Sequence, residues 1–209
     1  MTLTSQFRAG IVVALAALTM LLAHPLSAHA ATDMFVKLTP MNAQTPPIQG
    51  ESQDKALPGA INIKGFSWDI ESPATIGSTS GGAGAGKAKL NPLKITKSVD
   101  STSPALLAAA GAGTPFKDVA LIIRKAGATG SDAFLEYHLK TALVTNIETS
   151  ADSGDDGVQE TVTFAYGAIQ ERYMPQATPT GAAAKPIING WSQILNQPNT
   201  DSWIDPFNS

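Results

Sequence analysis

Residues 135–147 read Leu-Glu-Tyr-His-Leu-Lys-Thr-Ala-Leu-Val-Thr-Asn-Ile, and this stretch decides the fold class. Every odd position is apolar or Thr, while the even positions include Glu136, His138 and Lys140. Because successive side chains of a strand point to opposite faces, the pattern predicts a β-strand with one face in a core and one facing water or a partner. We therefore expect His138 to be an ordinary residue of an exposed polar face.

Further strands are expected on both sides of this one. Residues 118–125 are more uniformly apolar, which predicts a central strand that is covered on both faces. In residues 61–70 and 161–173 the apolar positions change parity, at Gly65 and at Gly167 respectively. Glycine tolerates the geometry of a bulge, and bulges bend strands, so these segments favour a barrel or a strongly coiled sandwich.

One short helix interrupts the strands. Ser103 is a suitable N-cap, Pro104 fits the first helical position, and residues 105–110 are strong helix formers. Gly111 and Gly113 are expected to end the helix.

Composition excludes several classes of function. The 209 residues hold 14 Lys and Arg against 17 Asp and Glu and form no basic cluster, which argues against a nucleic-acid binder. There is no Cys, and His138 is the only His after residue 30, so disulfides, thiol catalysis and metal sites of several His are excluded. We therefore expect no catalytic residue, no cofactor and no metal ligand.

Three short motifs in the sequence could carry chemistry. Residues 81–87 match the spacing of a phosphate-binding loop, but Ala88 stands where Ser or Thr should meet magnesium. Residues 152–157 suggest a calcium loop, yet Gly154 and Thr163 occupy positions that require oxygen ligands. No G-x-S-x-G motif is present to supply a nucleophile for His138. Turns and a Gly-rich hairpin loop explain the first two segments without a ligand.

Residues 1–30 have the layout of a secretory signal peptide. Arg8 precedes an uncharged run over residues 9–23, and Ala28-His29-Ala30 supplies the small-x-small pattern of a cleavage site. The apolar run is shorter than the roughly 20 residues that span a bilayer, which disfavours a membrane anchor. We expect cleavage between Ala30 and Ala31 and a protein that is secreted or periplasmic.

The order of segments after residue 32 resembles the Hcp family, the haemolysin-coregulated proteins that form the tube of bacterial type VI secretion systems. The resemblance rests on shared order and spacing and covers about residues 33–196. The segments that carry it are Asp33 to Lys37, Gly50 to Lys55, Ile61 to Trp68, Gly81 to Lys87, Thr96-Lys97, Asp100, Ser103-Pro104, Leu106, Ile123 to Gly127, Glu136-Tyr137, Glu160 to Phe164, and Gly190-Trp191.

The resemblance implies a mainly β fold, a compact β-barrel of two antiparallel sheets with one short flanking α-helix. It also implies a non-enzymatic subunit that forms homohexameric rings, stacks them into a tube, carries small effector proteins in the lumen, and works with spike and sheath proteins. We expect three parts: the signal peptide (1–30), the Hcp-like domain (31–174), and a linker with a C-terminal tail (175–209). The candidate loop for ring stacking contains Gly81, Gly82, Gly84, Gly86 and Lys87.

The signal peptide departs from the family pattern, since type VI tubes assemble in the cytoplasm. Cleavage after Ala30 would nevertheless leave Ala-Thr-Asp-Met, close to the N-terminus that is usual in the family. An exported Hcp-like protein is therefore expected. The rival hypothesis is a secreted β-sandwich binding module or adhesin that keeps the fold without the secretion machine, and such a module should be a monomer.

Overall fold

The computed structural model describes residues 31–75, 84–127, 133–153, 157–175 and 185–199, together with Ser202 and Pro206. A compact unit extends from Thr32 to Ser209. The predicted signal peptide (1–30) lies outside the described residues, and so do Gly81 and Gly82 of the predicted loop.

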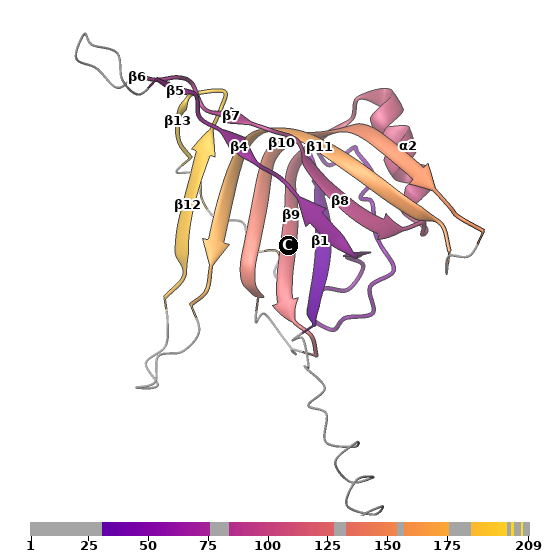
Figure 1. Ribbon diagram of the computed structural model, residues 1–209. Helices are drawn as coiled ribbons and strands as arrows, with labels where there is room; N and C mark the ends of the chain where they lie inside the picture. The colour runs from indigo at the N-terminus through magenta and orange to yellow at the C-terminus, as the bar shows by residue number, and fades with distance from the viewer. Residues whose placement is uncertain are drawn as a thin grey trace, which may run out of the picture. The chain divides into compact units, whose positions relative to one another are not determined.

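The described residues form a mainly β unit with one short helix, which confirms the predicted fold class. Figure 1 shows the long strands side by side, with the helix at one end of the sheet. The elements are β1 (Thr32–Pro40), β2 (Ile61–Ile63), β3 (Gly65–Ser67), β4 (Ile70–Glu71), β5 (Ala74–Thr75), β6 (Gly84–Ala85), β7 (Lys89–Leu90), β8 (Leu93–Ser98), α2 (Ser103–Ala112), β9 (Pro115–Lys125), β10 (Ala133–Ser150), β11 (Gln159–Tyr173), β12 (Ile187–Ser192) and β13 (Gln197–Pro198).

Within the described residues, the main sheet joins nine antiparallel strands. Its path runs β13-β12-β11-β10-β9-β1-β2, and β8 pairs with both β11 and β3. The two separate large sheets of the expected barrel are thus replaced by one continuous sheet, accompanied by the two-stranded ribbons β4–β7 and β5–β6. The reason is that β11 is long enough to pair with β8 along residues 159–164 and with β12 along residues 168–173.

The change of parity predicted at Gly167 is confirmed, and β10 changes parity at the same level. Lys140 pairs with Ala168 and Ala142 with Tyr166, so Thr141 lies opposite Gly167. Thr141 has a φ of 52°, a left-handed conformation that is unusual for a β-branched residue. The core positions of β10 accordingly change from Tyr137 and Leu139 to Ala142 and Val144, and the strict alternation expected through Ile147 is wrong beyond Thr141.

The change of parity predicted at Gly65 is also present. β2 pairs with β1, whereas β3 pairs with β8, and between them Lys64 donates its backbone N–H to Thr96 O at 2.7 Å. One short segment of chain thus joins two strands that are distant in the pairing order.

Apolar side chains are buried on both faces of the sheet. The larger core contains Val36, Leu38, Ile95, Leu139 and Phe164, and a smaller cluster on the other face contains residues such as Phe35, Leu57 and Ile122. Strand β9 contributes Leu121 to the first and Ile122 to the second, which confirms that it is central and covered on both faces.

Helix α2 forms as expected but begins differently. Its N-cap is Thr102, without a side-chain capping bond, so the expectation that Ser103 is the N-cap is wrong. Ser103 is the first residue of the helix, and its hydroxyl bonds Lys97 and Glu160, described below. Gly111 lies within the helix, and Gly113 ends it with a φ of 61°. Burial of Leu106, which is fully covered, contributes roughly 2 kcal/mol to the docking of the helix.

The loop between β1 and β2 covers the second face. Gly50 donates its N–H to Gly59 O at 2.7 Å, and a Cβ at position 50 would lie 2.3 Å from Ala60 O. Only glycine allows this close approach, which brings Leu57 and Ala60 onto the sheet. Within the described part of the chain, no helix is long and apolar enough to span a membrane.

Candidate functional site

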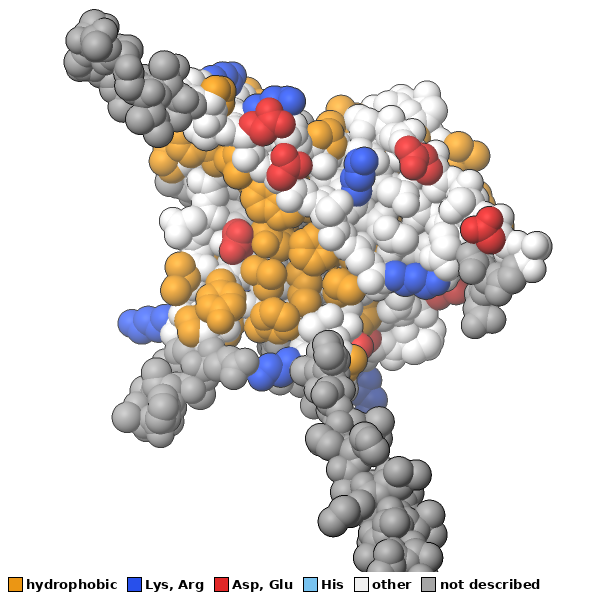
Figure 2. Space-filling model, in the orientation of Figure 1, with side chains coloured by type: hydrophobic (Ala, Val, Ile, Leu, Met, Phe, Trp, Pro, Cys, Tyr) orange, Lys and Arg blue, Asp and Glu red, His pale blue; other side chains and the backbone are white. Residues whose placement is uncertain are grey.

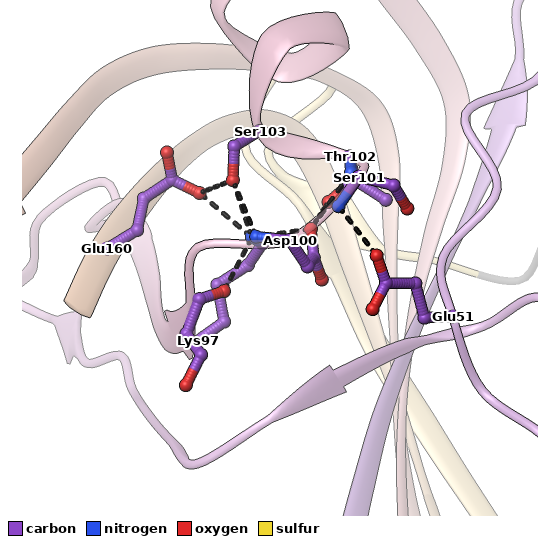
Figure 3. Close-up of polar contacts among 8 residues, drawn as sticks. Glu51, Lys97, Asp100, Ser101, Thr102, Ser103 and Glu160 are labelled. Atoms are coloured by element: carbon purple, nitrogen blue, oxygen red, sulfur yellow. Dashed lines mark hydrogen bonds and ion pairs between the residues drawn. The ribbon is translucent and has the colours of Figure 1, made fainter. Parts of the chain in front are cut away.

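A fully buried lysine lies at the point where β8, β11 and α2 meet (Figure 3). The Lys97 ammonium lies 2.9 Å from Asp100 Oδ1 and 2.9 Å from Glu160 Oε2, and it donates to Ser103 Oγ at 3.0 Å and to Ser98 O at 2.9 Å. We call Lys97, Asp100, Ser103 and Glu160 the Lys97 cluster. A Ser–Lys pair at this distance resembles a nucleophile with its base, but an ammonium held between two carboxylates has no lone pair to accept a proton.

The Lys97 cluster holds the start of α2 in place. Asp100 Oδ1 accepts hydrogen bonds from the backbone N–H and the hydroxyl of Thr102, at 2.9 and 2.5 Å, and Ser103 Oγ donates to Glu160 Oε2 at 2.8 Å. Burial opposes ionisation of Asp100, but the hydrogen bonds from Lys97 and Thr102 outweigh it, so the pKa of Asp100 lies below its ordinary value of 3.8. Glu51 accepts from Ser101 N at 2.9 Å and ties the β1–β2 loop to the same turn.

A second buried polar group lies on β9, β10 and β11. Asp118 Oδ2 lies 2.7 Å from His138 Nδ1, and Asp118 Oδ1 lies 2.7 Å from Lys140 Nζ. Glu136 pairs with Arg172 across β10 and β11, and its Oε2 lies 4.0 Å from His138 Nε2. We call these five residues the His138 cluster.

The expectation that His138 lies on an exposed face is therefore wrong, because its side chain is fully buried. Burial opposes the charged imidazolium, but hydrogen bonding to Asp118 and to Glu136 outweighs this effect and raises the pKa of His138 above 6.5. A buried imidazole cannot be reached by a substrate from solvent, so this geometry favours a structural role over general acid–base catalysis.

A third ion pair secures the β1–β2 loop. Arg124 is fully buried, lies 4.9 Å from the centre of the Phe35 ring, and donates to Asp54 Oδ2 at 2.5 Å and to Oδ1 at 3.2 Å. The hydrogen bond from Arg124 holds the pKa of Asp54 below 3.8. Asp54 Oδ1 also accepts from the backbone N–H groups of Ala56 and Leu57, so the pair shapes the loop itself.

The protein also has an exposed apolar surface, apart from these buried polar groups. Figure 2 shows hydrophobic side chains gathered over the middle of this face of the sheet. An open hollow of about 310 Å³ lies here, between the β3–β4 segment and strands β11 and β12. We call it the β12 groove, and the apolar side chains that line it are Trp68, Ile70, Ile169, Tyr173, Ile187 and Trp191. Large apolar side chains that are gathered in one exposed patch mark a surface that contacts another molecule.

Gly84, Gly86 and Lys87 of the predicted stacking loop lie in or beside two short ribbons, β4–β7 and β5–β6, which we call the arm. Gly84 belongs to β6 and pairs with Thr75, and Gly86 donates its N–H to Pro73 O at 2.6 Å. Lys87 is exposed and precedes β7, so no helix follows it as a phosphate-binding loop would require. Ala31, on the far side of the predicted cleavage point, is exposed.

The base of the arm is fastened to the sheet by polar contacts. The side-chain amide of Asn91 donates to Asp69 Oδ2 at 2.6 Å and to Glu71 Oε1 at 2.8 Å. Tyr166 OH donates to Asn91 O at 2.8 Å, and burial raises the pKa of Tyr166 to about 12. These contacts give the arm a fixed root on β11.

Sequence reasoning missed both buried clusters. Asp118 is the one acidic residue of β9 and directly precedes the apolar run of residues 119–123, and a carboxylate at such a position signals a buried partner. Lys97 and Asp100 stand three residues apart, just before a helix, but this spacing does not point to Glu160, which is 60 residues further along the chain.

Comparison with known proteins matches these features to one family. A family model described as "Type VI secretion system effector, Hcp" matches residues 35–173. Protein hcp1 of Pseudomonas aeruginosa is 32% identical over 162 residues, which are 78% of this chain and 95% of that protein.

Solved structures have the same fold. A type six secretion system protein gives a TM-score of 0.70 at 33% identity and covers 81% of this chain and 100% of its own. Hcp1 from Salmonella typhimurium gives 0.62 at 23% identity, over 81% of this chain and 99% of its own, which supports the fold. The matched segment runs from β1 to β11 and includes all three buried ion-pair groups, and the chain therefore belongs to the Hcp family of type VI secretion proteins.

Proposed function

We propose that this protein is an exported, non-enzymatic Hcp tube subunit that associates with copies of itself into rings and stacks those rings. Hcp-family proteins are secreted tube subunits of type VI secretion systems and form hexameric rings. The observation that carries the proposal is that an Hcp domain matched from β1 to β11 leaves a large apolar groove open to solvent. A protein that must bury such a surface does so against a partner, and for this family the partner is another copy.

The buried charges support a structural role rather than an enzymatic one. Lys97, Arg124 and His138 are each engaged by carboxylates of the same chain, within the fold. This arrangement stabilises the contacts between strands and loops. A catalytic group would have to face a cleft that substrate can enter.

Export through a signal peptide is part of the same proposal. The compact unit begins at Thr32, just after the predicted cleavage point between Ala30 and Ala31. A secreted or periplasmic ring assembled from residues 31–209 follows. Spike protein, sheath and small effector proteins in the lumen remain the partners that the family resemblance implies.

The arm is the proposed contact between stacked rings. The ribbons β4–β7 and β5–β6 flank residues 76–83 in the chain, and the root of the arm is held by Asn91 and Tyr166. An extended loop on a rigid root is suited to recognition of a neighbour. The rival hypothesis of a monomeric binding module is not favoured by the family match.

Light scattering on the protein exported by cells that express the full chain tests the proposal. We expect a mass near that of six subunits and, in negative-stain images, rings with an open centre. A monodisperse monomer at high protein concentration would overturn the proposal and support the binding module.

A further inference from the structure

A row of five paired positions crosses the main sheet from β1 to β12. Each position is the direct partner of the next in the register of the strands: Lys37 (β1), Ala120 (β9), His138 (β10), Gln170 (β11) and Gly190 (β12). Direct partners on neighbouring strands point to the same face of a sheet. Ala120 belongs to the smaller apolar cluster, so the row lies on the face onto which the β1–β2 loop folds. We call these five positions the cross-sheet row.

Both ends of the cross-sheet row bind a residue of the C-terminal part of the chain. Asn199, which follows β13, donates its backbone N–H to Gly190 O at 3.0 Å. At the other end, Lys37 Nζ donates to Pro206 O at 2.8 Å, and Pro206 is buried. The chain is therefore anchored beside β12 at residue 199 and on β1 at residue 206.

The length of chain between these two anchors leaves little choice of path. From β13 to β1 there are five spacings between neighbouring strands, or about 24 Å, which the reach of the Lys37 side chain shortens. The seven residues from Asn199 to Pro206 span at most about 25 Å when fully extended. Because Lys37 holds Pro206 on the face of the cross-sheet row, a nearly straight path has to pass over this row.

Burial of the row supports the same path. His138 is 0% exposed and Gln170 is 1% exposed, although both stand on a face of the sheet. A side chain on such a face loses its contact with water only when another part of the protein lies over it.

The composition of residues 200–205 suits this cover. The segment reads Thr-Asp-Ser-Trp-Ile-Asp and contains no Lys or Arg. Ser202 is exposed, and in an extended chain the residues on either side of an outward residue face inward, which directs Asp201 and Trp203 toward the sheet. Trp203 stands four residues after Asn199 and three before Pro206, close to the middle of the path, and His138 is the middle position of the row.

We propose that residues 200–205 of this chain cross the sheet along the cross-sheet row and that Trp203 covers His138. The proposal goes beyond the proposed function and does not depend on ring formation. On this proposal, the expected C-terminal tail is part of the folded domain, although it follows the residues 35–173 that the family model matches. The chain's own C-terminal segment then occupies this surface, which is closed to other partners.

Acylation of His138 by diethyl pyrocarbonate tests the cover, because His138 is the only His after residue 30. The rate is measured by mass spectrometry of the peptide that contains His138, in the exported full chain. Wild type should react slowly, and Trp203→Ser should raise the rate about tenfold or more, since the imidazole then reacts without a large opening of the fold. A stop codon after Asn199 should raise the rate at least as much.

Two matched controls separate loss of the cover from a general effect of substitution. Leu195→Ser also removes a large side chain from the C-terminal part, but Leu195 is 65% exposed, so the rate should stay at the wild-type value. Lys37→Met removes the anchor on β1 and should raise the rate, whereas Lys125→Met, at an exposed position at the end of β9, should not. Thermal melting followed by circular dichroism shows that each variant is folded.

The outcomes are distinct. Rapid acylation of His138 in the folded wild type, or a wild-type rate in folded Trp203→Ser, would overturn the proposal. The two point variants keep every strand, so they decide the question even where the truncated chain does not fold.

Dilution distinguishes the chain's own segment from that of a neighbouring copy. Protection by the same chain does not depend on protein concentration. Protection that is lost when the particles dissociate would assign the segment to a neighbouring copy and overturn the path within one chain. A monomeric wild type with a protected His138 would reject the proposed function and support this proposal.

Discussion

His138 Nδ1 lies 2.7 Å from Asp118 Oδ2, and the two residues stand on adjacent strands with both side chains buried. A second oxygen of the same carboxylate lies 2.7 Å from Lys140 Nζ. One carboxylate therefore joins two basic side chains of β10 to the centre of the sheet. The alternation of β10 predicts that this face is polar and points outward. In the structure, the pair of His138 and Asp118 lies in the interior of the protein.

His138 should make the stability of the fold depend on pH. The pKa of His138 is raised above 6.5 in the folded protein. Its contribution to the stability of the fold is therefore complete below the pKa of the unfolded state and is lost as the pH rises through the pKa of the folded state. The difference in unfolding free energy between wild type and His138→Gln should be larger at about pH 5.5 than at about pH 8.5. Urea denaturation at both pH values measures it, and a difference that grows with pH would contradict the prediction.

Removal of the Lys97 ammonium should destabilise the domain strongly. Lys97→Met leaves the carboxylates of Asp100 and Glu160 buried without their cation, and breaking such a pair costs about 3–5 kcal/mol. Lys94→Met, on the exposed face of the same strand, should change the unfolding free energy by no more than about 0.5 kcal/mol. The double variant Lys97→Met/Glu160→Gln should recover part of the lost unfolding free energy. Equal stability of Lys97→Met and Lys94→Met would refute the stabilising role of the Lys97 cluster.

Asp54 should hold the β1–β2 loop through its charge. Arg124 lowers the pKa of Asp54 in the folded protein. The contribution of Asp54 to the stability of the fold is therefore present above pH 3.8 and is lost as the pH falls through the pKa of the folded state. Asp54→Ala should cost up to about 3 kcal/mol, less than a fully buried pair because Asp54 is partly exposed. Asp152→Ala, at an exposed position after β10, is the control and should be close to neutral at pH 7.

The exported protein should begin at Ala31. N-terminal sequencing of the protein recovered from the periplasm or medium should read Ala-Thr-Asp-Met. Substitution Ala28→Arg should block processing, because signal peptidase requires a small residue there. An intact cytoplasmic protein that retains Met1 would remove the export proposal and leave ring formation untouched.

Deletion of residues 81–86 should separate the ring from the stack. The arm lies outside the main sheet, so the single ring should persist in light scattering while the number of stacked rings in negative-stain images falls. A variant that replaces Gly81 and Gly82 by Ser at unchanged length tests whether the length or the glycines matter. Loss of the single ring would show that the arm acts within the ring instead.

The sequence by itself determined the β class, the central position of β9 and the bends at Gly65 and Gly167. Each of these depends on a local pattern, the period of two or a glycine that interrupts it, and strand geometry converts such a pattern directly into faces. Resemblance in the order of segments was sufficient to identify the family before any geometry was known.

Only the tertiary structure decided which polar residues are buried. The alternation of residues 135–141 separates two faces but carries no information on what covers the second one. It predicts His138 on an exposed polar face, whereas His138 and Glu136 both lie in the interior. Likewise, the local sequence favours Ser103 as an N-cap. In the structure, its hydroxyl instead bonds Lys97 on β8 and Glu160 on β11. The physical reason is that strand periodicity is a property of neighbouring residues, whereas the burial of a charge depends on a partner brought close by register across the sheet.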